Sequence, residues 1–252
     1  MKKTLFLLAM VIIMLSFQGV TLEAVEQEND FLVYQKYGKT DVRWDEFVKS
    51  GLTAFDSGNL GTAEMFFQRA IARGCNDFLV YSKVGLYYES LNNYKRAMDY
   101  FKRAERLRTQ YPDHQLSKLF DEMMGRALYM SGQAEQAEPY LKKAAGADSF
   151  MAVYLLGQLT RERGNFEDAI KLFERALNMK HPTGVPPSID ILIMQEIGKA
   201  YFALKKYDES LVWWDKILTI DPSNSVAQTH KGNIEKAKFK EYEKKVIQEI
   251  TQ

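Results

Sequence analysis

A glycine recurs at one fixed position in five apolar segments of this chain. Each glycine precedes, by twelve residues, a small residue that is followed four and seven residues later by apolar ones. The glycines are Gly51, Gly85, Gly125, Gly157 and Gly198, and the small residues are Ala63, Ala97, Ala137, Ala169 and Ser210. A fixed period of this kind indicates an array of similar structural units, and it constrains the fold more than composition does.

Each unit contains an apolar segment, a short turn and a second apolar segment. Turns such as Ser57-Gly58-Asn59 supply a glycine that can end one helix and an Asn that can cap the next. A glycine inside a helix costs about 1 kcal/mol relative to alanine, so its recurrence needs a compensating contact. We expect the paired helix to approach closely there, with the small residue opposite. Larger residues are then expected to fill the space between hairpins, namely Phe67, Phe101, Leu141, Phe173 and Trp214.

The pattern resembles the tetratricopeptide repeat family from about residue 44 to residue 224. The second repeat carries it most clearly, in Tyr81, Gly85, Tyr88, Ala97, Phe101 and Ala104. The resemblance implies an all-α protein, a right-handed α-solenoid of about five helical hairpins with a C-terminal capping helix. The expected repeats are 44–77, 78–111, 118–149, 150–183 and 191–224.

The spacing of the glycines predicts two longer junctions. Successive glycines are 34, 40, 32 and 41 residues apart, whereas the unit of this family is about 34 residues. Insertions are therefore expected near 109–116 and near 180–188. Pro139 lies inside the expected second helix of the third repeat and predicts that this helix kinks or starts late.

Two further segments flank the repeats. Residues 225–252 form a charged segment with an apolar side, and we expect a helix that caps the stack. Its apolar side comprises Val226, His230, Ile234, Ala237, Tyr242, Val246 and Ile250. Residues 25–43 are expected to form a strap or short helix on the first repeat. Asp30–Gly38 matches Asp77–Gly85 at seven of nine positions, and coincidence is the equal alternative for so short a match.

Residues 1–24 have the features of a secretory signal peptide. Lys2 and Lys3 precede an apolar run from Leu5 to Phe17, which is shorter than the about 20 residues of a membrane-spanning helix. An extracytoplasmic location is expected, and specifically the periplasm of a bacterial envelope. An uncleaved anchor in the inner membrane, formed by residues 4–20, is the alternative, and it is the only membrane contact expected.

Composition and motifs do not support catalysis or nucleic-acid binding. Lys and Arg number 34 against 33 Asp and Glu, so there is no general basic character for nucleic acid. The chain has no nucleophile elbow, P-loop or dinucleotide-binding glycine motif. His114, His181 and His230 lack paired spacing and are interpreted as surface residues, and Cys75 as a buried small residue. We therefore expect no enzyme, no catalytic residue, no metal site and no cofactor.

The resemblance places a ligand groove on the first helices of the repeats. Carried over position by position, it predicts eleven groove residues that contact a protein or peptide: Phe55, Glu89, Glu122, Arg126, Tyr129, Tyr154, Gln158, Arg161, Gln195, Lys199 and Phe202. Aromatic and Arg side chains are common anchors at such surfaces. Each could instead serve only for packing between repeats. Val48 and Leu52 stand where the carboxylate-clamp members of the family have Lys and Asn, which argues against that clamp.

Two functions remain open at this point. The first is an exported scaffold or adaptor that binds a protein or peptide in the groove and organises an envelope complex. The second is a component of an outer-membrane assembly or transport machinery that presents a client or carrier protein. The residues do not identify the partner.

Overall fold

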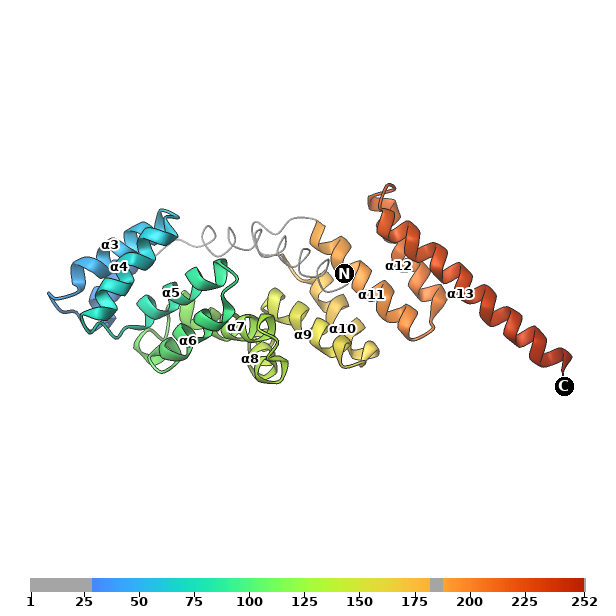
Figure 1. Ribbon diagram of the computed structural model, residues 1–252, viewed down its shortest axis with the longest axis horizontal. Helices are drawn as coiled ribbons and strands as arrows, with labels where there is room; N and C mark the ends of the chain where they lie inside the picture. The colour runs from blue at the N-terminus through green and yellow to red at the C-terminus, as the bar shows by residue number, and fades with distance from the viewer. Residues whose placement is uncertain (1–28, 182–187, 252) are drawn as a thin grey trace. The chain divides into compact units, whose positions relative to one another are not determined.

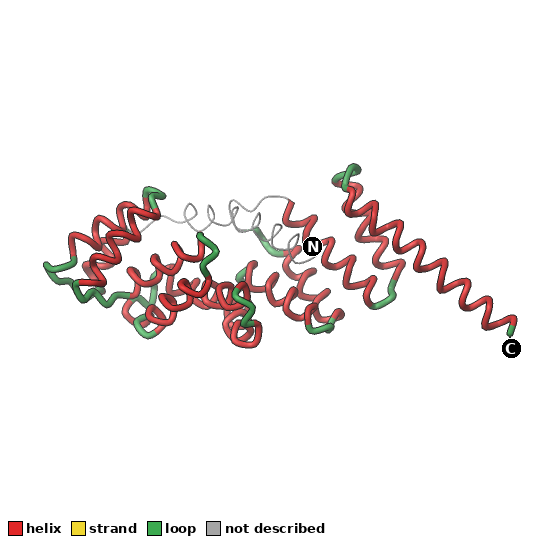
Figure 2. The backbone as a smooth tube through the Cα atoms, viewed as in Figure 1, coloured by secondary structure: helices red, strands yellow, loops and turns green. Residues whose placement is uncertain are grey.

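The computed structural model describes residues 29–181 and 188–251 of the 252-residue chain. These residues form twelve α-helices and one short 3-10 helix, and no strand lies among them (Figures 1 and 2). The signal peptide expected at residues 1–24 falls outside the described residues, as does most of the second expected insertion. No helix in the described ranges combines the length and apolar character that a membrane crossing needs.

Ten of the helices form five successive hairpins. The first helices are α3 (Asp45–Asp56), α5 (Phe78–Ser90), α7 (Gln115–Met130), α9 (Phe150–Glu162) and α11 (Ser188–Ala203). The second helices are α4 (Leu60–Ala72), α6 (Tyr94–Glu105), α8 (Ala134–Gly146), α10 (Phe166–Asn178) and α12 (Tyr207–Ile220). The predicted all-α architecture of five hairpins followed by a C-terminal helix is confirmed. The chain divides into two compact units, of which the first ends at Ala152 and the second begins at Val153, within α9.

The recurring glycines lie where the two helices of a hairpin touch. A Cβ added at Gly85 would stand 2.4 Å from Cε1 of Phe101, and one at Gly51 would stand 2.5 Å from the same atom of Phe67. The close approach was predicted, and in the fifth hairpin the small residue does lie opposite, because Ser210 donates to the Gly198 carbonyl at 2.7 Å. The large residue of the second helix, which was expected between hairpins, also lies against the glycine and takes the space that a Cβ would occupy.

The hairpin turns repeat one backbone conformation. The residue seven positions after each first-helix glycine has a positive φ, between 57° and 83°. Three of these residues are glycines, as expected for left-handed backbone, and the others are Asn92 and Lys205. The second helix then begins two residues later in every hairpin. Helix α8 follows this rule and begins at Ala134, so the late start expected from Pro139 is wrong.

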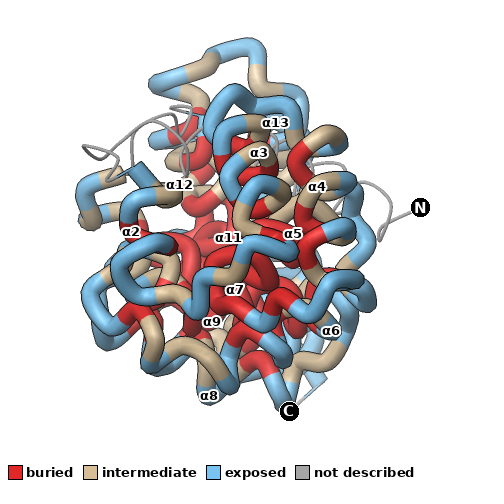
Figure 3. Tube along the Cα trace, turned by 90° about the vertical axis from the view of Figure 1, so that its left-hand side faces the viewer, coloured by how far each residue is buried: buried red, intermediate tan, exposed pale blue. Residues whose placement is uncertain are grey.

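Burial concentrates in the first helices. The first helices have more buried positions than the second helices. Figure 3 colours the buried residues red along the Cα trace. The added length of α7 and α11 falls before their glycines, where the two insertions were predicted. The first insertion also contains η1 (Arg108–Gln110) and Tyr111, whose side chain is buried.

The two flanking segments are helical in the structure. Helix α2 (Asp30–Tyr37) precedes the first hairpin and packs on α3. Helix α13 (Ser225–Ile250) packs on α12 through Ala227 and Ile234, which join Trp214 and Ile217 in one apolar cluster. The apolar side predicted for α13 contacts the stack only near its beginning, because Tyr242 is 65% and Ile250 78% exposed.

Candidate binding groove

The predicted groove residues share three positions relative to the glycines. They lie three residues before, one residue after and four residues after the glycine of a first helix. Positions three and four residues apart lie on the same side of a helix, so each first helix presents its groove residues as one stripe. This spacing places all eleven residues on α3, α5, α7, α9 and α11.

In the first unit, Arg126 lies between two carboxylates. Its Nε and Nη2 donate to Glu89 at 2.8 and 2.9 Å, and its Nη1 donates to Glu122 at 2.8 Å. The second Glu122 oxygen accepts a hydrogen bond of 2.8 Å from Ser149 Oγ. Three predicted groove residues therefore form one network across α5 and α7, with two negative charges against one positive charge.

The electrostatics of this network follow from its burial. Burial alone would lower the pKa of Arg126. The charge and hydrogen bonds of Glu89 and the charge of Glu122 together outweigh this effect, so the pKa of Arg126 is raised. The pKa of Tyr94 is raised to about 12, first by burial and then by the charge of Glu89. Arg126 stays charged and Tyr94 stays neutral at physiological pH. The positive charge of Arg126 in this network is therefore fixed.

Phe55 is covered by a cation from the next first helix. The Lys83 ammonium lies 4.0 Å from the centre of the Phe55 ring and is itself 5% exposed. Lys83 pairs with Asp30 of α2 at 2.6 Å and with Asp56 at 3.4 Å. Phe55 and Tyr129, at 6% and 8% exposure, are both buried.

In the second unit, α9 and α11 carry another polar network. Gln158 donates to the Tyr154 hydroxyl at 2.9 Å and accepts from Arg161 Nη2 at 2.9 Å. Arg161 Nε also forms an ion pair of 2.9 Å with Glu196. Burial, followed by the charge of Glu196, raises the pKa of Tyr154, so the phenol remains protonated.

The remaining groove residues differ in exposure. Lys199 pairs with Glu196 at 2.7 Å and its side chain is 37% exposed. Gln195 is buried, whereas Phe202 is 37% exposed and packs its ring 5.6 Å from that of Tyr207. Arg161 and Lys199 give this network two positive charges against one carboxylate. Lys199 and Phe202 are therefore the groove residues of this unit that are open to a ligand.

Sequence reasoning missed a fourth position in the register. Lys83 and Glu196 both stand two residues before a first-helix glycine, and each contacts the groove residue four positions after the preceding glycine. These partners are Phe55 and Arg161. A charged residue within an apolar first helix was the available signal, because a buried charge needs a partner on a neighbouring element.

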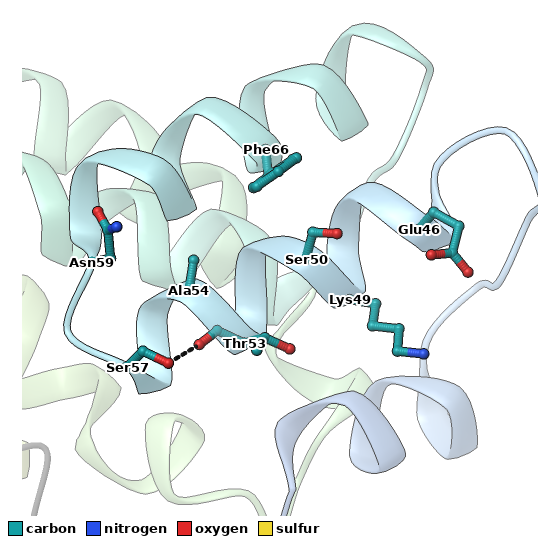
Figure 4. A pocket seen from close by; sticks show the side chains of 8 residues that line it. All are labelled: Glu46, Lys49, Ser50, Thr53, Ala54, Ser57, Asn59 and Phe66. Carbon is teal, nitrogen blue, oxygen red and sulfur yellow. Dashed lines mark hydrogen bonds between the residues drawn. The ribbon is translucent and has the colours of Figure 1, made fainter.

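An open pocket of about 440 Å³ lies on the first hairpin. It is lined by Glu46, Lys49, Ser50, Thr53, Ala54, Ser57, Asn59 and Phe66. Figure 4 shows Phe66 of α4 facing the side of α3 that carries Ser50 and Ala54, with Ser57 donating to the Thr53 carbonyl at 2.8 Å. None of the predicted groove residues lines it.

The three histidines and the cysteine are partly or fully buried in the structure. Within residues 29–181 and 188–251, no group of three His, Cys, Asp or Glu residues could hold a metal ion. The surface interpretation of the histidines was wrong, because all three are half-buried. His114 pairs with Asp30, and His230 stacks on Trp214 at 4.4 Å. Burial raises the pKa of Cys75 to about 12, which keeps its thiol protonated.

Comparisons with known proteins agree with this architecture. Tetratricopeptide repeat models match residues 122–184 and, separately, residues 80–111 and 192–224. Together these segments cover about half of the chain and parts of four of the five hairpins. No curated protein matches the sequence.

Several solved structures share the fold at low sequence identity. YrrB, described as a tetratricopeptide repeat protein with an unusual peptide-binding site, is 20% identical with a TM-score of 0.60, and the match covers 80% of this chain and 97% of YrrB. MamA from Desulfovibrio magneticus RS-1 is 17% identical with a TM-score of 0.58, over 74% of this chain and 99% of MamA. The C-terminal part of a repeat protein from Cytophaga hutchinsonii is 19% identical with a TM-score of 0.59, over 76% and 71%.

Proposed function

Because the chain belongs to the tetratricopeptide repeat family, we propose that it is an exported scaffold that binds a protein or peptide on its first helices and organises an envelope complex. The peptide-binding site named for YrrB supports a ligand of this class. The basic start and apolar run of residues 1–24 support export.

The observation that carries this proposal is that neighbouring side chains hold several groove residues in place. Arg126 and Arg161 are each held by carboxylates, and Gln158 bridges Tyr154 and Arg161. Binding loses free energy whenever it must immobilise long side chains, at about 0.5–1.5 kcal/mol for each one. Side chains already fixed by their neighbours avoid most of that loss. The first helices therefore supply a preorganised surface.

The exposed residues of the second unit indicate the chemistry of the ligand. Phe202 offers an aromatic surface, and Lys199 stands one helical turn before it. Glu196 neutralises only one of the two cations around it. A peptide segment with a carboxylate beside an apolar side chain would fit this surface.

The experiment compares two double variants purified from the native envelope after mild crosslinking. The groove variant carries Lys199→Ala and Phe202→Ala. The control variant carries Lys216→Ala and Val212→Ala, which remove the same charge and an exposed apolar side chain from α12. We expect the groove variant to retain roughly tenfold less of the partner than the wild type, and the control to retain all of it.

Equal recovery by both variants would contradict binding at these first-helix positions. Recovery of no partner by the wild-type protein would contradict the scaffold itself. A partner from a transport or outer-membrane assembly machine, lost only in the groove variant, would favour the alternative function. N-terminal sequencing of the purified protein tests cleavage of residues 1–24.

A further inference from the structure

Helix α2 rests on the first helices of the first unit. It packs on α3, and its side chains also reach α5 and the segment that leads into α7. Tyr34 of α2 is 0% and Val33 6% exposed. Within this unit α2 therefore lies beside Lys83, the residue whose ammonium covers the predicted groove residue Phe55.

The acidic end of α2 is bound by two groups. Asp30 Oδ2 lies 2.6 Å from Lys83 Nζ, and Asp30 Oδ1 lies 2.9 Å from His114 Nε2. Asn29, rather than Asp30, caps the helix, which leaves the Asp30 carboxylate available for these contacts. Nδ1 of His114 accepts the Leu116 N–H at 3.2 Å, so Nε2 is the protonated nitrogen that faces Asp30.

The tyrosine one turn later is bound equally specifically. The Tyr34 hydroxyl donates to Asp45 at 2.8 Å and accepts from Trp44 Nε1 at 3.0 Å. Burial, followed by the hydrogen bond to Asp45, raises the pKa of Tyr34, so this hydroxyl remains a donor. The end of α2 lies against Tyr111, since a Cβ at Gly38 would stand 2.6 Å from the Tyr111 hydroxyl.

The first inserted junction supplies some of the residues that contact α2. Tyr111 and His114 both belong to the segment that lengthens the second repeat beyond its usual period. Tyr111 donates to Asp77, the N-cap residue of α5, and its ring packs 6.0 Å from that of Tyr37. The insertion thus contributes residues to a site that a repeat of the usual length would lack.

We propose that the first helices of the first unit form a receptor for a short helix that carries an acidic residue and, four positions later, a tyrosine, and that α2 occupies this receptor within its own chain. Lys83 and His114 bind the acidic side chain, and Trp44 and Asp45 bind the tyrosine hydroxyl. A partner helix with the same two groups competes with α2. This inference rests on the proposed function, because it names a class of ligand that binds on the first helices.

The first test is amide hydrogen exchange of the full-length chain. Asp30→Asn should speed exchange of the α2 amides roughly tenfold to a hundredfold, because a charge-assisted contact is lost, while α3, α5 and α7 keep their rates. Asp99→Asn, at an exposed position of α6, is the matched control and should change nothing. In a chain that already carries Lys83→Met, Asp30→Asn should speed the exchange of the α2 amides little further, because both substitutions remove the contact between Asp30 and Lys83.

The second test uses a synthetic peptide of residues 29–38 with blocked ends as the probe. At millimolar concentration, comparable to that of a segment tethered to its site, it should shift the Trp44 indole N–H signal of the Asp30→Asn chain. A peptide with Asp30→Asn and Tyr34→Phe should not. The chain used in both titrations keeps the four residues that should bind the peptide, which are Trp44, Asp45, Lys83 and His114.

Three results would overturn the receptor. They are unchanged α2 exchange in Asp30→Asn, equal acceleration of α3, α5 and α7, or an identical response to both peptides, including none. None of these results depends on Lys199 or Phe202, so failure here is distinguishable from failure of the scaffold proposal.

Discussion

At the scale of single residues, two glycines in the same register have opposite surroundings. A Cβ added at Gly198 would stand 2.9 Å from Trp214 Cε2, whereas one at Gly232, 34 residues later, would meet nothing within 4 Å. Both glycines lie inside helices. The difference arises because α12 lies against α11 at Gly198, whereas no side chain of the described residues lies against α13 at Gly232.

Gly198→Ala and Gly232→Ala should therefore change stability in opposite directions. The first should lower the free energy of unfolding by about 1–3 kcal/mol, because the rigid indole must shift. The second should raise it by up to about 1 kcal/mol, because alanine favours the helix. Urea denaturation followed by circular dichroism measures both. A loss of stability in both variants would contradict the crowding argument.

Asp77 gives a prediction about pH. Burial raises the pKa of its carboxyl more than the hydrogen bond from Tyr111 lowers it. A carboxyl with a raised folded-state pKa binds protons more tightly when folded, so its contribution to stability falls as pH rises above its unfolded value of about 3.9. Asp77→Asn retains a capping oxygen and removes the charge.

We therefore expect Asp77→Asn to be as stable as the wild type or more stable at pH 7, and to lose that advantage near pH 4. Urea titrations of both proteins at several pH values measure this difference in the free energy of unfolding. A loss of more than about 2 kcal/mol at pH 7 would show that the charged carboxylate is needed.

Single residues also show where sequence reasoning stopped. The glycines and the large residues of the second helices were identified correctly, because a fixed period connects them along the chain. The contact of Asp30 with Lys83 and His114 was not foreseeable. It joins residues 53 and 84 positions apart in a segment outside the repeat, where no period indicates which side chains meet.

At the scale of elements, neighbouring first helices are joined by buried ion pairs. Arg126 is 7% exposed and is held by Glu89 of the preceding first helix and by Glu122 of its own. Removing one member of a buried pair leaves an uncompensated charge, which usually costs more than the pair contributes.

Arg126→Met should lower the free energy of unfolding by about 3–5 kcal/mol, and Glu89→Met combined with it should recover much of that loss. Lys142→Ala is the matched control, because its pair with Glu138 lies on the surface and should contribute less than about 0.5 kcal/mol. Thermal and urea unfolding measure these differences. No recovery in the double variant would mean that Arg126 acts through packing alone.

Helix α13 offers a comparison within one element. Ile234 is 0% exposed in the cluster with Trp214, whereas Ile250 is 78% exposed. Ile234→Ala should cost about 2–5 kcal/mol, and Ile250→Ala less than about 0.5 kcal/mol. Equal effects, measured by urea unfolding, would contradict the conclusion that only the beginning of α13 caps the stack.

The elements were also predicted unequally well. The five hairpins follow from the register, and four of the five turns were marked by Gly, Asn or Ser near the left-handed residue, whereas the fifth has Lys205 there. The reach of α13 was overestimated, because an apolar stripe on a helix does not show where its packing partner ends. Helix α12 ends at Ile220, and α13 continues for a further 26 residues after the connecting turn.

At the scale of the whole molecule, repetition accounts for the fold and departures from repetition account for its particular surfaces. The inserted junction before α7 supplies some of the contacts of α2, and α13 continues beyond the part that packs on α12. The first helices carry fixed polar networks in each unit, with Phe202 and Lys199 open in the second. These features are consistent with a protein whose work is to bind other chains.

Site-specific photo-crosslinking in the native cell tests most directly whether the first helices bind a partner. A photoreactive amino acid would replace Phe202 on α11 in one strain and Val212 on α12 in another, two exposed apolar positions of 37% and 53%. Binding on the first helices predicts a discrete crosslinked partner from position 202 and none from position 212. The same products from both positions, or a product only from position 212, would contradict binding on the first helices.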